Sequence, residues 1–206
     1  MVPVGALYLF PTIALVIAYQ FPDLVFQPPP VGTKGEPLLR HCGRLGRQFM
    51  VVSFFLITIV WWLALTFVSP ITDDHSQFVV KHVIPILAYY VFAILFMAFQ
   101  RGKDIVRVTG QQSGLSWRTE VASQHLQNTT DQIILFVFSL FCLNASLTTP
   151  QLALIPASVS LWISGQVLFL LGYSVENLTV CEFGFELMIF TRIACLAFAG
   201  LKLYVL

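Results

Sequence analysis

The sequence predicts an all-α integral membrane protein with about six membrane-spanning helices and no soluble domain of its own. Of its 206 residues, 57% are hydrophobic and only 10% are charged, whereas soluble domains carry roughly 25% charged residues. The mean hydropathy is +0.83. A surface made of so many apolar side chains requires lipid as its solvent.

Six apolar stretches approach the length of about 20 residues that a helix needs to cross a bilayer. The fourth is the shortest, but the preceding segment Glu120–Asp131 contains no glycine or proline and can extend its helix out of the membrane. The stretches are Val4–Gln20, Phe49–Val68, Val83–Phe99, Ile133–Leu147, Leu152–Tyr173 and Phe183–Leu206.

Prolines fall in or beside several of these stretches. Pro85 and Pro150 lie near expected first turns, where a missing backbone N–H is harmless. Pro11 and Pro156 lie inside expected spans, so we expect them to kink their helices.

Basic residues are concentrated in two of the connecting segments, which predicts the orientation. Pro22–Gln48 and Gln100–Glu120 each carry four Lys or Arg residues, whereas Ser69–His82 carries only Lys81. Basic loops stay on the cytoplasmic side, so the first two segments should be cytosolic, and Ser69–His82 and both termini should be lumenal or external. Three consecutive prolines in Pro22–Gln48 predict an extended linker with a basic juxtamembrane end.

Several functional classes are disfavoured by composition. A net charge of +1 without a clustered basic face argues against nucleic-acid binding. The four cysteines are scattered and form no C-x-x-C pair, so a disulfide framework or zinc site is not expected. The Asp73-Asp74-His75 segment has no defined metal-ligand spacing, so no metal site is predicted.

The segment before the fourth span carries an unusual set of polar side chains. Gln124, Asn128 and Asp131 are spaced i, i+4 and i+7, so on a helix they share one face. That stripe ends in a carboxylate at the membrane boundary. It is either a solvated helix end or a line of polar contacts between helices.

The last span contains charged residues within apolar sequence. Ionisable side chains inside spans are costly and usually face the bundle interior, where they pair. Arg192 is the one cation well inside any expected span. We expect it to pair with Asp131 or Glu186 and so to fix the packing of the helices.

Two short motifs resemble those of the MAPEG superfamily, the membrane-associated proteins of eicosanoid and glutathione metabolism. Gln127–Gln132 resembles the R-x-x-x-N-x-x-E signature of that family's second helix, and Gly165–Tyr173 resembles the end of its third. Phe183–Phe185 resembles the start of its fourth helix. The resemblance implies a four-helix membrane domain over residues 83–206 and a homotrimer with sites between subunits. Residues 1–82, with two further spans and the linker, lie outside the family pattern.

Departures from the family pattern fall at the positions that bind glutathione. Gln124, Gln127 and Gln166 stand where glutathione-using members carry basic residues, and no Lys or Arg occurs between Arg118 and Arg192. The two carboxylates of glutathione would remain unpaired in a partly desolvated site. We therefore predict no glutathione or other cofactor, no catalytic residues and no metal. The motif residues are predicted to be polar contacts of the bundle: Gln124, Asn128, Asp131, Gln166, Tyr173, Glu186 and Arg192.

Two functions remain open. The first is a non-catalytic MAPEG-like scaffold that binds membrane lipids, other membrane proteins and copies of itself in endoplasmic reticulum, Golgi or lysosome-related membranes. A divergent branch of the superfamily has an added N-terminal pair of spans, and likeness to it implies roles in granule secretion and receptor handling. The alternative is a membrane-bound transferase or peroxidase that acts on glutathione or a lipid. A transporter is a weaker third.

Overall fold

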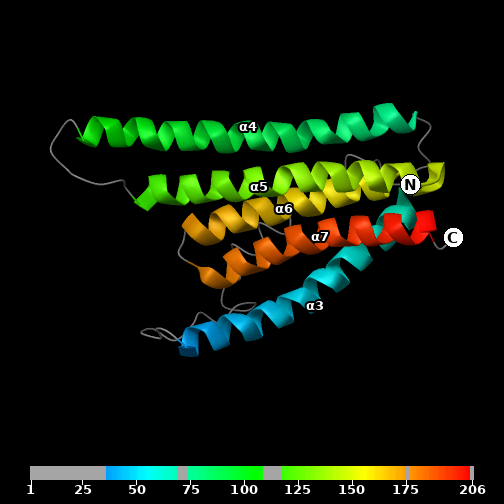
Figure 1. Ribbon diagram of the computed structural model, residues 1–206, viewed down its shortest axis with the longest axis horizontal. Helices are drawn as coiled ribbons and strands as arrows, with labels where there is room; N and C mark the ends of the chain where they lie inside the picture. The colour runs from blue at the N-terminus through cyan, green and yellow to red at the C-terminus, as the bar shows by residue number, and fades with distance from the viewer. Residues whose placement is uncertain (1–35, 69–73, 109–116, 175–176, 205–206) are drawn as a thin grey trace.

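The computed structural model describes residues 36–68, 74–108, 117–174 and 177–204, and Figure 1 shows their arrangement. Five long helices and one short 3₁₀ turn make up these residues. They are α3 (Glu36–Phe67), α4 (His75–Val108), α5 (Trp117–Ser146), η2 (Thr149–Gln151), α6 (Leu154–Ser174) and α7 (Leu178–Tyr204).

Each of these five helices is long and apolar enough to cross a membrane. They match the second to sixth of the expected spans to within two residues at the ends that fall short, so the prediction of a helical membrane protein is confirmed for the described residues. The first expected span, Val4–Gln20, lies outside them. The number of six spans and the orientation across the membrane stay predictions.

Several helices extend beyond their apolar stretches, and this corrects the expected linkers. Helix α3 begins at Glu36, so the basic end of the Pro22–Gln48 linker is helical rather than extended. Helix α4 begins at His75, within the segment expected to be a loop. Residues 82 and 83, where the two expected parts of the chain meet, therefore lie inside α4. A helix that leaves the membrane can continue in water because its backbone hydrogen bonds are internal.

Because of these helix boundaries, the proline expected in a first turn lies inside its helix, and the proline expected inside a span lies in a first turn. Pro85 lies inside α4 rather than in its first turn. Pro156 lies in the first turn of α6, which begins at Leu154, so it needs no N–H donor there and the expected kink has no cause.

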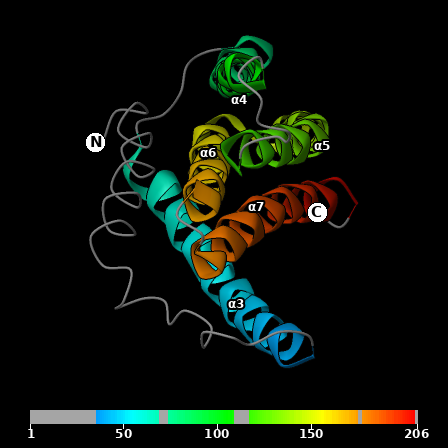
Figure 2. The ribbon, with the colours of Figure 1, turned by 90° about the vertical axis from the view of Figure 1, so that its left-hand side faces the viewer.

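Helix α6 lies at the centre of the bundle and contacts each of the other four long helices, as Figure 2 shows from the end. Fifteen of its 21 residues are buried, a larger share than in any other described helix. The Trp162 ring of α6 stacks on Phe136 of α5, with 5.0 Å between ring centroids. Helix α3 also packs on α6, where Trp61 of α3 donates a hydrogen bond to the Ser158 hydroxyl of α6 at 3.1 Å.

Helices α6 and α7 cross at two facing glycines. A Cβ atom built on Gly184 would lie 2.6 Å from the carbonyl oxygen of Gly165 and 2.5 Å from the backbone nitrogen of Phe169. A Cβ on Gly165 would lie 2.8 Å from the carbonyl oxygen of Gly184. In lipid, helices associate through close packing and polar contacts rather than through hydrophobic burial, so this backbone contact fixes where α7 lies on α6.

Candidate functional site

Four polar side chains from three helices meet inside the bundle. We call Tyr89 of α4, His125 and Thr129 of α5, and Gln166 of α6 the interior polar cluster. His125, Thr129 and Gln166 are fully buried, and Tyr89 is half-buried. A buried polar group without a partner is costly, so the contacts within this cluster decide what it can do.

Two hydrogen-bonded pairs make up the interior polar cluster. The Tyr89 hydroxyl lies 3.1 Å from His125 Nε2. The Thr129 hydroxyl lies 3.1 Å from Gln166 Oε1 and 2.8 Å from the backbone carbonyl oxygen of His125, so its single proton is shared between two acceptors. Through these contacts α4 is tied to α5, and α5 to α6.

Two buried nitrogen atoms of the cluster, His125 Nδ1 and Gln166 Nε2, have no hydrogen-bond partner among the described residues. If the Tyr89 hydroxyl donates to His125 Nε2, the imidazole carries its proton on Nδ1. Both nitrogens are then donors that need an acceptor, which a bound water molecule supplies in many protein interiors. No cation or carboxylate belongs to the cluster, so it offers hydrogen bonds but no charge to an anionic ligand.

Aromatic rings enclose the cluster. The imidazole of His125 stacks on the Phe169 ring, with 6.0 Å between centroids, and meets Tyr89 edge to face. Tyr89 also contacts Trp162 edge to face. Tyr173, which the sequence resemblance singled out, is half-buried, and its ring lies 4.9 Å from that of Phe169. These rings form an apolar wall around the cluster, of which Tyr89 alone is partly exposed.

The predicted polar stripe of α5 faces the other way. Gln124 and Asp131 are exposed, as is Gln127 between them, and Asn128 at the edge of this face is half-buried. We call the three exposed side chains, Gln124, Gln127 and Asp131, the α5 polar stripe; it differs from the predicted stripe in having Gln127 in place of Asn128. In the described residues Gln124 and Asp131 therefore point away from the packed helices, whereas the side-chain nitrogen of Asn128 is buried there without a hydrogen-bond partner. The expected role of these side chains as contacts between helices stays a prediction. Gln166 alone of the predicted motif residues belongs to the interior polar cluster.

The expected ion pair of Arg192 is not formed in the described residues. Arg192 and Glu186 are both half-buried on α7, while Asp131 is exposed on α5. No ion pair joins Arg192 to either carboxylate in this part of the chain. Glu186 and Arg192 are six residues apart, which places them on different sides of a helix with 3.6 residues per turn.

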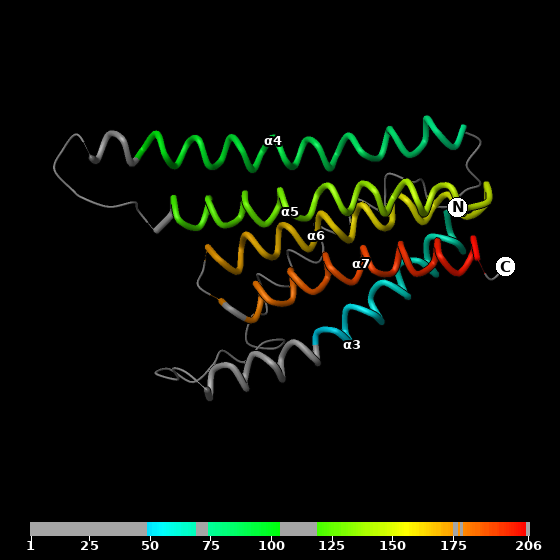
Figure 3. The backbone as a smooth tube through the Cα atoms, viewed as in Figure 1, coloured from blue at the N-terminus to red at the C-terminus, as the bar shows by residue number. Residues whose placement is uncertain are grey.

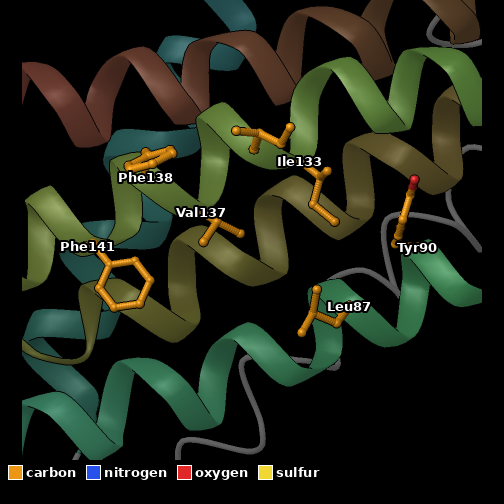
Figure 4. A pocket seen from close by; sticks show the side chains of 7 residues that line it. Leu87, Tyr90, Ile133, Val137, Phe138 and Phe141 are labelled. Carbon is orange, nitrogen blue, oxygen red and sulfur yellow. The ribbon is translucent and has the colours of Figure 1, made fainter.

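An apolar groove runs along the outer surface between α4 and α5 (Figure 4). Its volume is about 330 Å³, and Tyr90 brings the one hydroxyl group of its lining. Ile134 and Phe138 of this groove lie on the same exposed side of α5 as Asp131. The lining residues are Leu87, Tyr90, Ile133, Ile134, Val137, Phe138 and Phe141.

Comparison with known proteins adds no relative. No family model, curated protein or solved structure matches the chain. The described residues also contain no group of three or more His, Cys, Asp or Glu side chains that could hold a metal ion.

Sequence reasoning missed Tyr89, His125 and Thr129 as members of one cluster. His125 and Thr129 are four residues apart, so they share a helix face, and that spacing was available in the sequence. Tyr89 lies on another helix, and only the packing of α4 on α5 brings its hydroxyl to His125.

Proposed function

We propose that this chain is a non-catalytic, MAPEG-like membrane scaffold that binds other membrane proteins, and copies of itself, through the outer face of α5. The observation that carries the proposal is the outward direction of the α5 polar stripe. Polar side chains that face acyl chains are unfavourable, whereas side-chain amides and carboxylates hydrogen-bond readily across helix interfaces. The three residues belong to Thr119–Ser146, a stretch that is long and apolar enough to cross a membrane, and where they lie in the bilayer such a stripe favours a helix of another protein as its neighbour.

The electrostatics of the interior support a role without thiol chemistry. The interior polar cluster contains no Lys, Arg, Asp or Glu side chain, and Gln166 occupies it where the family's glutathione users carry a basic residue. Membership of the superfamily, in its divergent mattrin-like branch, is part of the proposal. So are a homotrimeric assembly, a secretory or lysosome-related membrane and a role in granule secretion or receptor handling.

Photo-cross-linking in native membranes tests the scaffold proposal. A photoreactive residue at Gln127 should give discrete protein adducts, because the α5 polar stripe faces another protein. The matched control is Leu95 of α4, which is 62% exposed and belongs to no polar stripe, so it should give lipid adducts alone. Lipid adducts alone at Gln127, or no adduct at all, would contradict the proposal.

A membrane-bound transferase or peroxidase is the second candidate, and one contact favours it. The Tyr89–His125 pair is a hydrogen-bonded couple that could move a proton. Its substrate would be glutathione or a lipid peroxide.

Calorimetry separates these two functions. We expect detergent-solubilised protein titrated with millimolar glutathione to show no saturable heat, because no guanidinium or ammonium group from Thr119 to Thr191 can balance the two carboxylates. A micromolar dissociation constant that is lost on Arg101→Gln would favour the enzyme, since the exposed Arg101 lies in the last two turns of α4, which ends at Val108, where a neighbouring subunit could supply it.

A further inference from the structure

The groove between α4 and α5 is apolar along its length and ends at one hydroxyl group. The two helices lie antiparallel and side by side (Figure 3), and Figure 4 shows Tyr90 at one end of the lining and Phe141 at the other. Tyr90 lies beside Thr130 of α5. Phe141 follows Thr130 by eleven residues, or about 17 Å along the helix axis. The groove therefore offers a long apolar surface with a polar group at one end.

The hydroxyl group of Tyr90 has a proton to donate. The Thr130 hydroxyl lies 2.8 Å from the backbone carbonyl oxygen of Leu126, which takes its single proton. The Tyr90 and Thr130 hydroxyls are 3.4 Å apart, whereas O–H···O hydrogen bonds are usually about 2.7–2.8 Å long. No other described residue accepts a hydrogen bond from Tyr90. A ligand oxygen at normal distance is therefore a better acceptor for the Tyr90 proton.

The groove suits a neutral oxygen rather than an anion. None of the residues that line it carries a charge, and α5 has no Lys or Arg after Arg118. On α4 the nearest basic residues in the sequence, Lys81 and Arg101, are at least two helical turns from Tyr90. A carboxylate or phosphate desolvated here would lack a cation. A carbonyl oxygen accepts a hydrogen bond and needs no counter-charge.

The size of the groove indicates one hydrocarbon chain. Its volume of about 330 Å³ is at the lower end of the roughly 300–1,000 Å³ that ligand pockets span. Phe138 and Phe141 line it and are 66% and 46% exposed, so a chain that lies along the groove covers both rings. Apolar contact alone does not distinguish one lipid chain from another in a membrane. The hydrogen bond to Tyr90 therefore decides which lipid is selected.

We propose that the groove between α4 and α5 binds a neutral lipid that has one hydrocarbon chain and a carbonyl oxygen near its end, such as a fatty ester, amide or ketone. The Tyr90 hydroxyl donates a hydrogen bond to this carbonyl oxygen, and the chain lies along Ile134 and Phe138 toward Phe141. The site is complete within one chain. It requires neither a second copy nor the scaffold function.

Photoaffinity labelling of the purified full chain tests this site in alkyl maltoside micelles, which contain no carbonyl group. The probe is a long-chain methyl ketone with a diazirine in the middle of its chain, and the matched probe is the same molecule without the oxygen. The ketone should label the lining residues saturably, and unlabelled ketone should compete. The hydrocarbon should label them at least roughly threefold less, because it lacks one hydrogen bond. Peptide mass spectrometry locates the adducts.

Two variants with matched controls connect the labelling to the groove. Tyr90→Phe removes the donor and keeps the ring, so ketone labelling should fall to the level of the hydrocarbon. Tyr204→Phe, at a tyrosine that is 89% exposed on α7, should change nothing. Ile134→Trp fills the groove from an exposed position and should abolish saturable labelling by the ketone. Leu95→Trp makes the corresponding change at an exposed position of α4 outside the groove and should leave labelling as in the wild type.

The remaining outcomes decide against the site. Equal labelling of the groove by both probes, or ketone labelling that survives Tyr90→Phe, would overturn the hydrogen bond and with it the selection of a carbonyl lipid. Unsaturable adducts spread over the exposed faces of the helices would mean that the probe reports bulk lipid, and the site would be overturned. None of these results bears on the scaffold proposal, and loss of protein adducts at Gln127 would leave the lipid site in place.

Discussion

Replacement of Gly184 by alanine is expected to destabilise the bundle by at least about 3 kcal/mol, the upper end of the usual cost of overpacking. The added methyl group would lie 2.6 Å from the Gly165 carbonyl oxygen and 2.5 Å from the Phe169 nitrogen. Both are backbone atoms, so no side chain can rotate away, and α6 and α7 must separate. Thermal unfolding in detergent and the monodisperse fraction in size-exclusion chromatography measure the loss.

Gly200→Ala is the matched control, because it makes the same change on the same helix where a Cβ meets nothing within 4 Å. Its fold should be as stable as that of the wild type, or slightly more stable, since alanine favours helices over glycine. Equal stability of Gly184→Ala and wild type would mean that the α6 and α7 backbones do not touch.

His125→Leu is expected to destabilise the protein by about 1–2 kcal/mol, because it leaves the part-buried Tyr89 hydroxyl without its partner. Adding Tyr89→Phe should restore much of the loss, since removal of both members of a hydrogen bond leaves no unsatisfied group. A double-mutant cycle of wild type, both single variants and the double variant measures this coupling.

A suitable control for the cycle is Tyr90→Phe. The Tyr90 hydroxyl lies 3.4 Å from the Thr130 hydroxyl, and Tyr90 lines the groove between α4 and α5 rather than belonging to the interior polar cluster. It should show no coupling to His125→Leu. Strictly additive effects of Tyr89→Phe and His125→Leu would contradict the contact. They would leave the interior polar cluster as two independent side chains.

The helices were predictable because the length of an apolar run sets a span, and five of the expected runs coincide with described helices. Their ends were not, as the start of α4 at His75 illustrates. The length of an apolar run in the sequence is set by the thickness of the bilayer, whereas the residue at which a helix begins or ends depends on local capping. Asn177 is such a cap, because its side-chain oxygen accepts hydrogen bonds from the backbone N–H groups of Thr179 and Val180 just where α7 begins.

The direction in which each face points was also beyond the sequence. Spacing correctly grouped Gln124 with Asp131 on one face of α5, but that face is exposed, and the face with His125 and Thr129 is buried. On a helix of a soluble protein the polar side faces solvent, so the residue types on each side show which side is buried. In a membrane both the lipid and the protein interior accept apolar side chains, so the two sides of α5 cannot be ranked by hydrophobicity alone.

The central position of α6 bears on how the protein is made. Helix α7 provides the most extensive contact to α6, yet the ribosome synthesises α7 last of the five described helices. Until α7 enters the bilayer, the side of α6 that it covers, with the small surface of Gly165, faces acyl chains or an insertion factor. The central helix of the folded bundle is therefore more exposed during biogenesis, and completion of the described interior depends on translation of α7.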